Sequence, residues 1–395
     1  MNKKQILTNT FRKMKKKFLF AVSSLICTSV ISLTSCSNND GPQLEEDDSA
    51  TLDYTEKNAA SWGNYMVQVA GLLRADAATL YDSWTSSYEG GPSFAASFKS
   101  HNGGDYSSAL SCLEQIIEGC ADIANEVGTA KIGDPYQLYM SGNTKSALYA
   151  VESWYSWHSR EDYSNNILSI RNSYYGSLDG TVNEKSLSAL IATVNRELDS
   201  NMKSAIENAS SKILAIPQPF RNHINSAESL AAMTACADLE ELLSNDLKFA
   251  VTSLGDDSRF QNIVDNYVDV VVIPTYKSLK DKNSALYQAV LNFKNSPSDA
   301  NFANACNAWL EAREPWEKSE AFLFGPVDAL GLDPNMDSWP LDQDNIVQIL
   351  NSGNFDNLDW NDDDDDDTIE AVQSVRGFHT LEFLLFKDGQ PRKVK

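Results

Sequence analysis

Apolar residues recur at steps of three and four along most of the chain, and this spacing constrains the fold more than any other feature of the sequence. One such series is Trp62, Met66, Val69, Leu73 and Ala77. Residues spaced in this way line one face of an α-helix, where they can be buried together. Patterns that alternate in steps of two are scarce, and the β-branched run 268–273 lies inside a longer helical pattern. The sequence therefore predicts an all-α fold.

Length and loop signals predict two domains. A Gly-Asp-Asp turn at 255–257 divides the chain into the ranges 51–250 and 258–395, each of which has the size of an ordinary domain. We expect each range to form a helical domain. Six consecutive aspartates, 362–367, interrupt the second range. We interpret them as a solvated loop, with a dedicated calcium site as the alternative.

The N-terminus has the features of an export signal. Residues 1–35 hold seven Lys and Arg and no acid, and their apolar stretch 18–33 is shorter than the roughly 20 residues of a membrane-spanning helix. Leu-Thr-Ser then precedes Cys36, which resembles the lipobox of bacterial lipoproteins. We predict that residues 1–35 are a signal peptide, that Cys36 is acylated, and that residues 36–50 form an acidic tether. The alternative is an ordinary signal that carries a cysteine by chance.

Acidic residues outnumber basic residues by 55 to 32, and the net charge is −23. Nucleic-acid binding depends on Lys and Arg contacts to phosphate, so the sequence predicts no nucleic-acid partner. A negatively charged surface instead attracts cations and basic partners. The cysteines beyond Cys36 are irregularly spaced in a long chain, and we expect buried thiols rather than disulfides.

A helix predicted to begin near Ser296 carries charged residues on its apolar face. The positions on that face are Phe302, Ala305, Trp309, Arg313, Trp316 and Glu320. The aromatic side chains predict that the face is buried. Because a buried charge needs a partner, Arg313 and Glu320 are candidate site residues.

The C-terminal helix shows the same anomaly at His379 and Glu382, which lie one turn apart on a face that is otherwise apolar. A carboxylate buried there is costly unless a cation, hydrogen-bond donors or a metal ion compensates it. One interpretation makes His379 and Glu382 ligands of one ion, with Glu320 as a further ligand. Oxygen-rich ligation with one His favours iron or another hard-to-borderline divalent metal. The other interpretation is that neighbouring helices, including Arg313, satisfy both side chains.

These residues lie in segments that resemble the imelysin-like proteins, which are named for an insulin-cleaving membrane protease and include iron-uptake-associated lipoproteins. Gly377 to Glu382 is similar to the family's Gly-x-His-x-x-Glu signature. Ala308 to Trp316, which contains Arg313, is similar to the family's other long signature. Further segments that resemble the family are 319–328, 339–342, 152–156 and 170–176.

The resemblance implies two helical-bundle domains with a cleft between them, and His379 and Glu382 at or near that cleft. It makes Arg313 and Glu320 neighbours of the site. It also adds three expected ligand-binding residues, Glu152, Ser156 and Asp328.

The order of the segments differs from the usual order of the family. Usually the Arg-containing segment comes first, the His-x-x-Glu segment follows, and a second helical half comes last. Here the second half comes first. We therefore predict a circular permutation, with the usual ends joined near residues 245–260.

Together these features predict a lipid-anchored binding protein of the cell envelope, on the outer membrane. It would hold iron, or a ligand that carries the metal, for uptake, and act with other iron-uptake envelope proteins. The first alternative is a metal-dependent peptidase of the imelysin type; the sequence shows no nucleophile signature. The second alternative is a binder of envelope polysaccharide, which the Trp and Tyr content permits.

Overall fold

The computed structural model describes residues 52–101, 106–361 and 363–395. The predicted signal peptide, the lipid attachment site Cys36 and the tether 36–50 lie outside the described residues. Within the described part, regular structure is almost entirely helical, and the strands found there, β1 (Phe386–Lys387) and β2 (Gln390–Pro391), form a short antiparallel pair. The structure confirms the predicted all-α fold.

The α-helices are α2 (Ala59–Thr85), α3 (Phe94–Ser100), α4 (Ala109–Glu126), α5 (Gly133–Met140), α6 (Thr144–Ala150), α7 (Ser159–Tyr175), α8 (Leu187–Val194), α9 (Arg196–Ala215), α10 (Ala227–Glu241), α11 (Lys248–Thr252), α12 (Phe260–Asn266), α13 (Ile273–Asn295), α14 (Asp299–Glu317), α15 (Pro326–Ala329), α16 (Leu332–Asp337), α17 (Gln343–Ser352), α18 (Asp366–Gln373) and α19 (Gly377–Leu385). The π-helical turns are η1 (Val127–Lys131), η3 (Leu242–Leu247) and η4 (Tyr267–Val272), and the 3₁₀ turns are η2 (Phe220–Asn222) and η5 (Glu320–Phe322).

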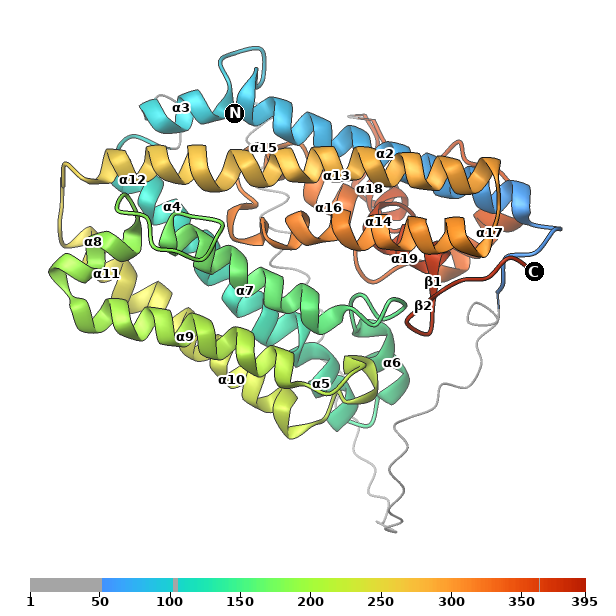
Figure 1. The fold of residues 1–395 in the computed structure, drawn as a ribbon, viewed down its shortest axis with the longest axis horizontal. Coiled ribbons are helices and arrows are strands. Elements are labelled where there is room, and N and C mark those ends of the chain that lie inside the picture. The colour runs from blue at the N-terminus through green and yellow to red at the C-terminus, as the bar shows by residue number, and fades with distance from the viewer. Residues whose placement is uncertain (1–51, 102–105, 362) are drawn as a thin grey trace, which may run out of the picture. The chain divides into compact units, whose positions relative to one another are not determined.

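The long helices α2, α13 and α14 run side by side and form one group (Figure 1). The short helix α19 packs against α2 and α14. α14 begins two residues later than expected, because Ser298, rather than Ser296, accepts the capping hydrogen bond from the backbone N–H of Asn301. The apolar stripe of α14 is buried, as its spacing predicted.

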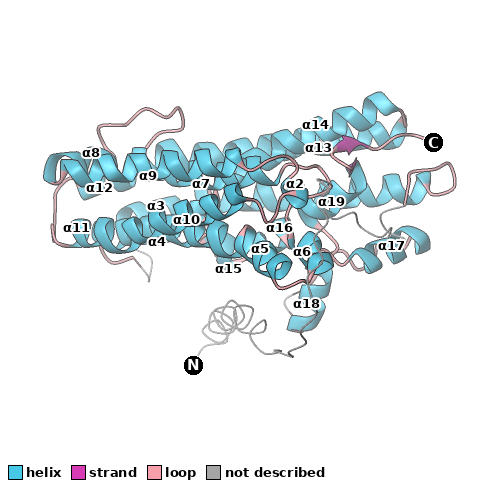
Figure 2. Cartoon of the chain, turned by 90° about the horizontal axis from the view of Figure 1, so that it is seen from below, coloured by secondary structure: helices cyan, strands magenta, loops and turns pink. Residues whose placement is uncertain are grey.

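A second group consists of α4, α7, α9 and α10, which pack against one another (Figures 1 and 2). The two groups meet where α14 contacts α7 and where η5 contacts α4 and α7. All described residues belong to one compact unit. The predicted domain boundary between 250 and 258 stays a prediction; the structure adds that α2, from the first range, packs with α13 and α14 of the second.

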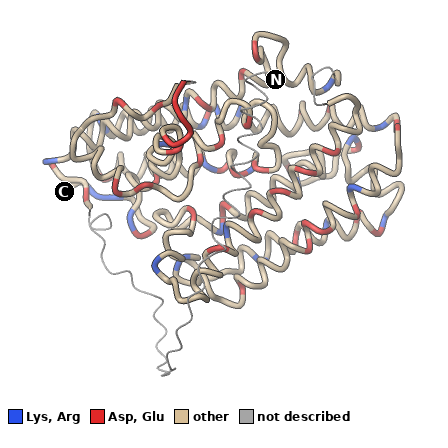
Figure 3. Tube along the Cα trace, turned by 180° about the vertical axis from the view of Figure 1, so that it is seen from behind, with Lys and Arg blue, Asp and Glu red and all other residues tan. Residues whose placement is uncertain are grey.

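No helix in the described part of the chain combines the length and the apolar character needed to cross a lipid bilayer. Acidic and basic residues are distributed over both groups of helices (Figure 3). Cys112, Cys120, Cys236 and Cys306 are free and buried, as predicted.

Candidate functional site

Arg313 lies at the centre of a buried cluster of charged side chains. The apolar stripe of α14 carries it into the interior, where it has no exposed surface. Its guanidinium forms an ion pair with Asp337, and its Nη2 lies 2.5 Å from Glu317 Oε1 and 3.5 Å from Glu152 Oε1. Its Nε lies 3.7 Å from Asp162 Oδ2. Four carboxyl groups therefore surround one permanent cation.

The start of α19 brings the C-terminal helix close to this cluster. Gly377 has a φ of +84°, and a Cβ at this position would lie 2.6 Å from the carbonyl oxygen of Met336. Only glycine adopts this conformation and this close approach without strain. The glycine of the Gly-x-His-x-x-Glu segment thus seats α19 against the end of α16.

His379 is fully buried and has acidic partners on both sides of its ring. Nε2 lies 3.0 Å from Asp337 Oδ1 and 3.3 Å from Glu152 Oε1, and Nδ1 lies 3.2 Å from Glu382 Oε2. Burial and the charge of Arg313 both lower the pKa of His379, but the hydrogen bonds and charges of its acidic neighbours outweigh them and hold the pKa well above its usual value. These acidic neighbours therefore favour the protonated form of the ring.

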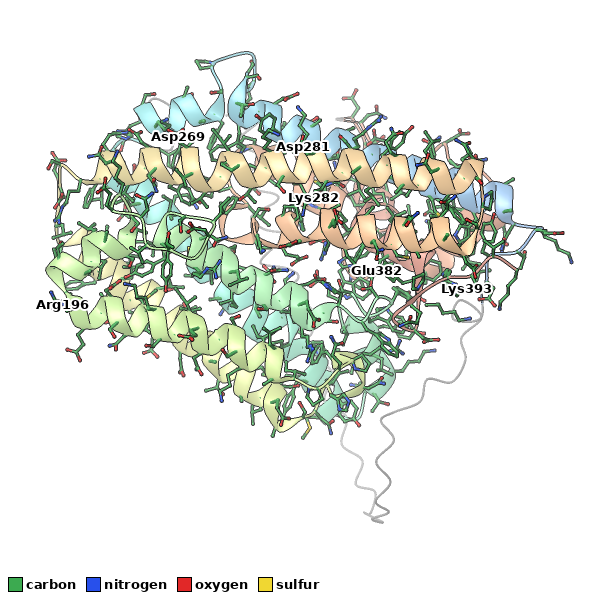
Figure 4. The ribbon with its side chains drawn as sticks, viewed as in Figure 1. Arg196, Asp269, Asp281, Lys282, Glu382 and Lys393 are labelled. Carbon is green, nitrogen blue, oxygen red and sulfur yellow. The ribbon has the colours of Figure 1, made fainter. Side chains whose placement is uncertain are left out.

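Glu382 has no exposed surface and is held by two groups of donors. Its Oε1 accepts hydrogen bonds from the backbone N–H of Ser156 at 2.8 Å and from the Ser156 hydroxyl at 2.7 Å, while Oε2 faces His379. Figure 4 shows Glu382 within the body of helices, whereas Arg196 and Lys393 lie at its periphery. These bonds satisfy the buried carboxylate that the sequence marked as anomalous.

Glu152 is bound to a second buried cation. Lys131, at the end of η1, places its Nζ 2.9 Å and 3.2 Å from the two Glu152 carboxylate oxygens. Burial raises the pKa of Glu152, but Lys131 and the hydrogen bond from His379 lower it further, to about 2. Glu152 is thus a carboxylate at any physiological pH.

Two further acids lie on the other side of Asp337. Burial raises the pKa of Glu317 to about 8, and burial with like charges raises the pKa of Glu320 well above its usual value. Asn166 donates to Glu317 Oε2 at 2.5 Å. The Oδ1 of Asn166 is buried and has no hydrogen-bond partner among the described residues. Burial therefore favours the protonated form of both acids.

Asp162 completes the cluster from α7. It accepts a hydrogen bond from the Ser153 hydroxyl at 2.6 Å and lies 2.8 Å from His158 Nδ1. Burial lowers the pKa of His158, but the charge and hydrogen bond of Asp162 outweigh it and raise that pKa to about 9.

Acids and bases are interleaved in this buried cluster. Its acids are Glu152, Asp162, Glu317, Glu320, Asp337 and Glu382, and its bases are Lys131, His158, Arg313 and His379. Each of the four bases lies within 4.0 Å of at least one of these acids. A buried cluster of this size is tolerable because its charges are paired and hydrogen-bonded.

The structure brings together most of the residues that the sequence singled out. His379, Glu382, Arg313, Glu152 and Ser156 form one connected network. Glu320 is buried and lies near Asp337, but in a different group from His379 and Glu382. Asp328 is exposed on α15, apart from this network.

Sequence reasoning missed Lys131, Asp162, Glu317 and Asp337. Glu317 carried a usable signal, because it lies four residues after Arg313 on the same helix, the spacing at which an ion pair forms. Asp162 and His158 have the same spacing. Lys131 and Asp337 lie at the ends of short turns and had no periodic signal.

Two groups of side chains in the described residues could hold a metal ion. One is Glu152, Asp337 and His379, and the other is Glu317, Glu320 and Asp337; within each group the ligand atoms lie within 4.8 Å of one another. The first offers one nitrogen and two oxygens, and the second offers oxygens alone, beside the unpartnered Asn166 Oδ1. Both donor sets fit a hard-to-borderline divalent metal.

Comparison with known proteins supports the resemblance. Residues 41–245 and 272–394, most of the chain, match the family model described as Imelysin. The chain belongs to the imelysin family. This imelysin resembles the crystal structure of an imelysin peptidase from Bacteroides ovatus, with a TM-score of 0.87 and 62% identity, over 88% of this chain and 100% of that one.

A curated relative of this imelysin is Iron-regulated protein A of Synechococcus elongatus. The two are 35% identical over 128 residues, which make up 32% of each chain. The imelysin chain therefore spans about a third of the length of the curated relative that it matches.

Proposed function

We propose that this protein binds a divalent metal ion, iron by preference, in its buried charged cluster. The observation that carries the proposal is the convergence of Glu152, Asp337 and His379, from three separate segments, with their ligand atoms within 4.8 Å of one another. The name of the Synechococcus relative, Iron-regulated protein A, supports iron as the metal. A metal bound there would supply a concentrated positive charge in place of protons.

The expected roles of the residues follow from their hydrogen bonds. Glu152, Asp337 and His379 Nε2 would hold the ion. Glu382, itself fixed by Ser156, would orient His379 through its Nδ1, in the way that outer carboxylates fix metal-binding histidines. This revises the ligand set expected from the sequence, because Glu382 takes a supporting role and Glu320 belongs to the all-oxygen group.

Arg313 competes with an ion for the same atoms. Its guanidinium pairs with Asp337, and its Nη2 lies 3.5 Å from Glu152 Oε1 and 3.3 Å from His379 Nε2. In the metal-free protein the guanidinium therefore neutralises the ligand group. Binding of an ion requires that these contacts be given up.

A metal-dependent peptidase is the second candidate, because the Bacteroides ovatus relative is described as an imelysin peptidase. The burial of the cluster opposes this function. His379, Arg313 and Glu382 have no exposed surface, so a peptide bond reaches them only after the structure opens.

Metal binding and proteolysis are tested with one set of proteins. We would measure Mn²⁺ and anaerobic Fe²⁺ binding to residues 37–395 by calorimetry, in the wild type and in the variants His379→Ala, Glu152→Gln and Asp328→Asn. We expect one metal per wild-type chain, at least about a 100-fold loss of affinity in the first two variants, and no change in the exposed control Asp328→Asn. Absence of binding in the wild type refutes the proposal. Cleavage of unfolded casein by the metal-loaded wild type, lost in Glu152→Gln, would favour the peptidase.

We further propose that the protein is anchored in the cell envelope through acylated Cys36, where it acts with other iron-uptake proteins. The apolar stretch 18–33 and Leu-Thr-Ser before Cys36 support this location. Radiolabelled palmitate should be incorporated into the wild type and not into Cys36→Ala. Equal labelling of both would refute acylation at this position.

We also propose that the chain is a circular permutation of the usual family order. Two observations support it: the family match omits residues 246–271, around the expected junction, and the described ends lie together, with Lys395 Nζ 2.5 Å from Asp53 Oδ2. A variant that joins residue 395 to residue 52 through a short linker and opens the chain within 255–257 should therefore fold with an unchanged circular dichroism spectrum. Failure of this variant to fold would count against the proposal.

A further inference from the structure

A small cavity of about 250 Å³ opens at the surface close to the charged cluster. Its lining residues are Tyr149, Trp339, Pro340, Leu341, Asp342, Gln343 and Asp344. Pro340, Asp342 and Asp344 are exposed and form its outer part. The cavity thus lies between the end of α6 and the segment that joins α16 to α17.

Trp339 separates this cavity from His379. Its ring lies 4.8 Å from the imidazole ring, centroid to centroid, with the two planes at 63°. Its indole Nε1 donates to the backbone carbonyl of Ala150 at 3.1 Å. Trp339 follows Asp337 by two residues, and Ala150 precedes Glu152 by two. One side chain therefore covers His379 and bridges the two segments that carry the other proposed ligands.

The cavity is large enough to hold a hydrated metal ion. Its volume of about 250 Å³ far exceeds the roughly 10–15 Å³ that one water molecule needs on the same measure.

The charge at the cavity mouth selects a cation. Asp342 and Asp344 are exposed there, and the described lining contains no Lys or Arg. The Asp342 side chain also caps α17 by accepting from the backbone N–H of Asn345 at 3.0 Å, which fixes it in place. Charges of one sign at a concave mouth raise the local concentration of counter-ions.

We propose that this cavity is the access path by which a hydrated divalent cation reaches His379, and that Trp339 is the movable wall between them. The inference rests on the proposed metal-binding function and adds to it the route by which the hydrated ion enters. Motion of the indole breaks its bond to Ala150 and opens the way to Glu152, Asp337 and His379 together.

The test is the rate of Mn²⁺ binding, measured by stopped-flow competition with a metal-indicator dye. Trp339→Ala should bind and release Mn²⁺ at least about tenfold faster than the wild type. The equilibrium affinity should change by less than about threefold, because loss of the indole speeds entry and exit of the ion alike. Trp339→Phe keeps a ring but loses the bond to Ala150, and its rates should lie between the two. The matched control is Trp360→Ala, which removes an indole that bonds to Asn335 Oδ1 on α16 and does not line the cavity.

A second probe tests the cavity itself. Hexaamminecobalt(III) has the size of a hydrated ion and does not exchange its ligands, so it can occupy the cavity but cannot bind to His379. It should slow Mn²⁺ association to the wild type, and slow it less in Asp344→Asn, without displacing metal that is already bound.

The outcomes separate this inference from the function on which it rests. A wild type that binds no Mn²⁺ refutes the proposed function and the access path with it. A wild type that binds Mn²⁺, with unchanged rates in Trp339→Ala and Trp339→Phe, refutes the access path alone. Should Trp339→Ala fail to fold, the rates of Trp339→Phe and the effect of hexaamminecobalt(III) decide.

Discussion

Replacement of Arg313 by Met should destabilise the protein strongly while it strengthens metal binding. Removal of one partner from a buried ion pair costs about 3–5 kcal/mol, because the other charge stays buried without compensation. Arg313 has no exposed surface, and its loss leaves Asp337, Glu317 and Glu152 without their central cation. We therefore expect Arg313→Met to lower the free energy of unfolding by about 3–5 kcal/mol.

The partner of Arg313 offers an internal check. Burial raises the pKa of Asp337, but Arg313 and His379 lower it far more, so Asp337 is ionised beside the guanidinium. Replacement of Asp337 by Asn in the Arg313→Met background removes the uncompensated charge. The double variant should therefore be more stable than the sum of the single effects predicts, by about 1–3 kcal/mol.

The same variant tests competition between arginine and metal. Without the guanidinium, Glu152, Asp337 and His379 are open to an ion, so Mn²⁺ should bind more tightly than to the wild type. At 100 times its dissociation constant, a bound ion adds about 2.7 kcal/mol of stability. Saturating Mn²⁺ should thus recover most of what Arg313→Met loses.

The assay is urea unfolding followed by circular dichroism and by tryptophan fluorescence, and free energies are taken where the two transitions coincide. The matched control is Arg160→Met. Arg160 forms a partly exposed pair with Glu161 at 2.9 Å, and such pairs contribute less than about 1 kcal/mol. Its Nη1 also donates to the backbone carbonyls of Leu214 and Ile216, so this variant sets a strict comparison. The reasoning is refuted if Arg313→Met costs no more than Arg160→Met, or if its effect adds simply to that of Asp337→Asn.

Two further predictions concern the conformation and the pH dependence of the fold. Gly377→Ala should destabilise the protein by at least about 2 kcal/mol and weaken metal binding, because the positive φ and the 2.6 Å approach to Met336 both oppose a side chain. Thermal unfolding would measure the stability and calorimetry the metal affinity. A variant with the stability and the affinity of the wild type would contradict the prediction. The pKa of His158 is raised from 6.5 to about 9 by Asp162, so its contribution to stability is complete below pH 6.5 and is lost as the pH rises through 9. The difference in unfolding free energy between the wild type and His158→Gln should therefore shrink by up to about 3 kcal/mol across that window, and a constant difference would show that the ring is not charged.

The parts of the fold that depend on helical periodicity could be predicted from the sequence. The stripe that contains Trp309 and Trp316 is buried, and the charged residue on that stripe, Arg313, is the centre of the cluster. His379 and Glu382 were conspicuous for the same reason, since a titratable residue on an apolar face must find partners in the interior.

The two interpretations of His379 and Glu382 both describe part of the structure. Neighbouring segments do satisfy these side chains, through Asp337, Glu152 and Ser156, and Arg313 lies beside His379. The same contacts assemble the donor atoms that a metal would need. Whether protons or a metal ion balance the carboxylates is a question of chemistry that spacing along the chain does not answer.

The remaining members of the cluster could not be predicted because tertiary packing alone places them. Asp337 lies at the end of the short helix α16, and Lys131 ends a π-helical turn, so neither belongs to a repeating pattern. Asp328 shows the converse: its segment resembles the family, yet its side chain is exposed. The boundary near 250 stays a prediction, and periodicity gave no sign that α2 packs against helices from the far end of the sequence.

The central claim is that a divalent metal binds among Glu152, Asp337 and His379, and anomalous X-ray diffraction from crystals of residues 37–395 soaked in Mn²⁺ tests it most directly. The account predicts a single strong anomalous peak at bonding distance from His379 Nε2 and from carboxylate oxygens of Glu152 and Asp337, with the guanidinium of Arg313 displaced from those oxygens. A structure at saturating Mn²⁺ in which Arg313 keeps its contacts and the peak is absent, or lies elsewhere, would contradict it.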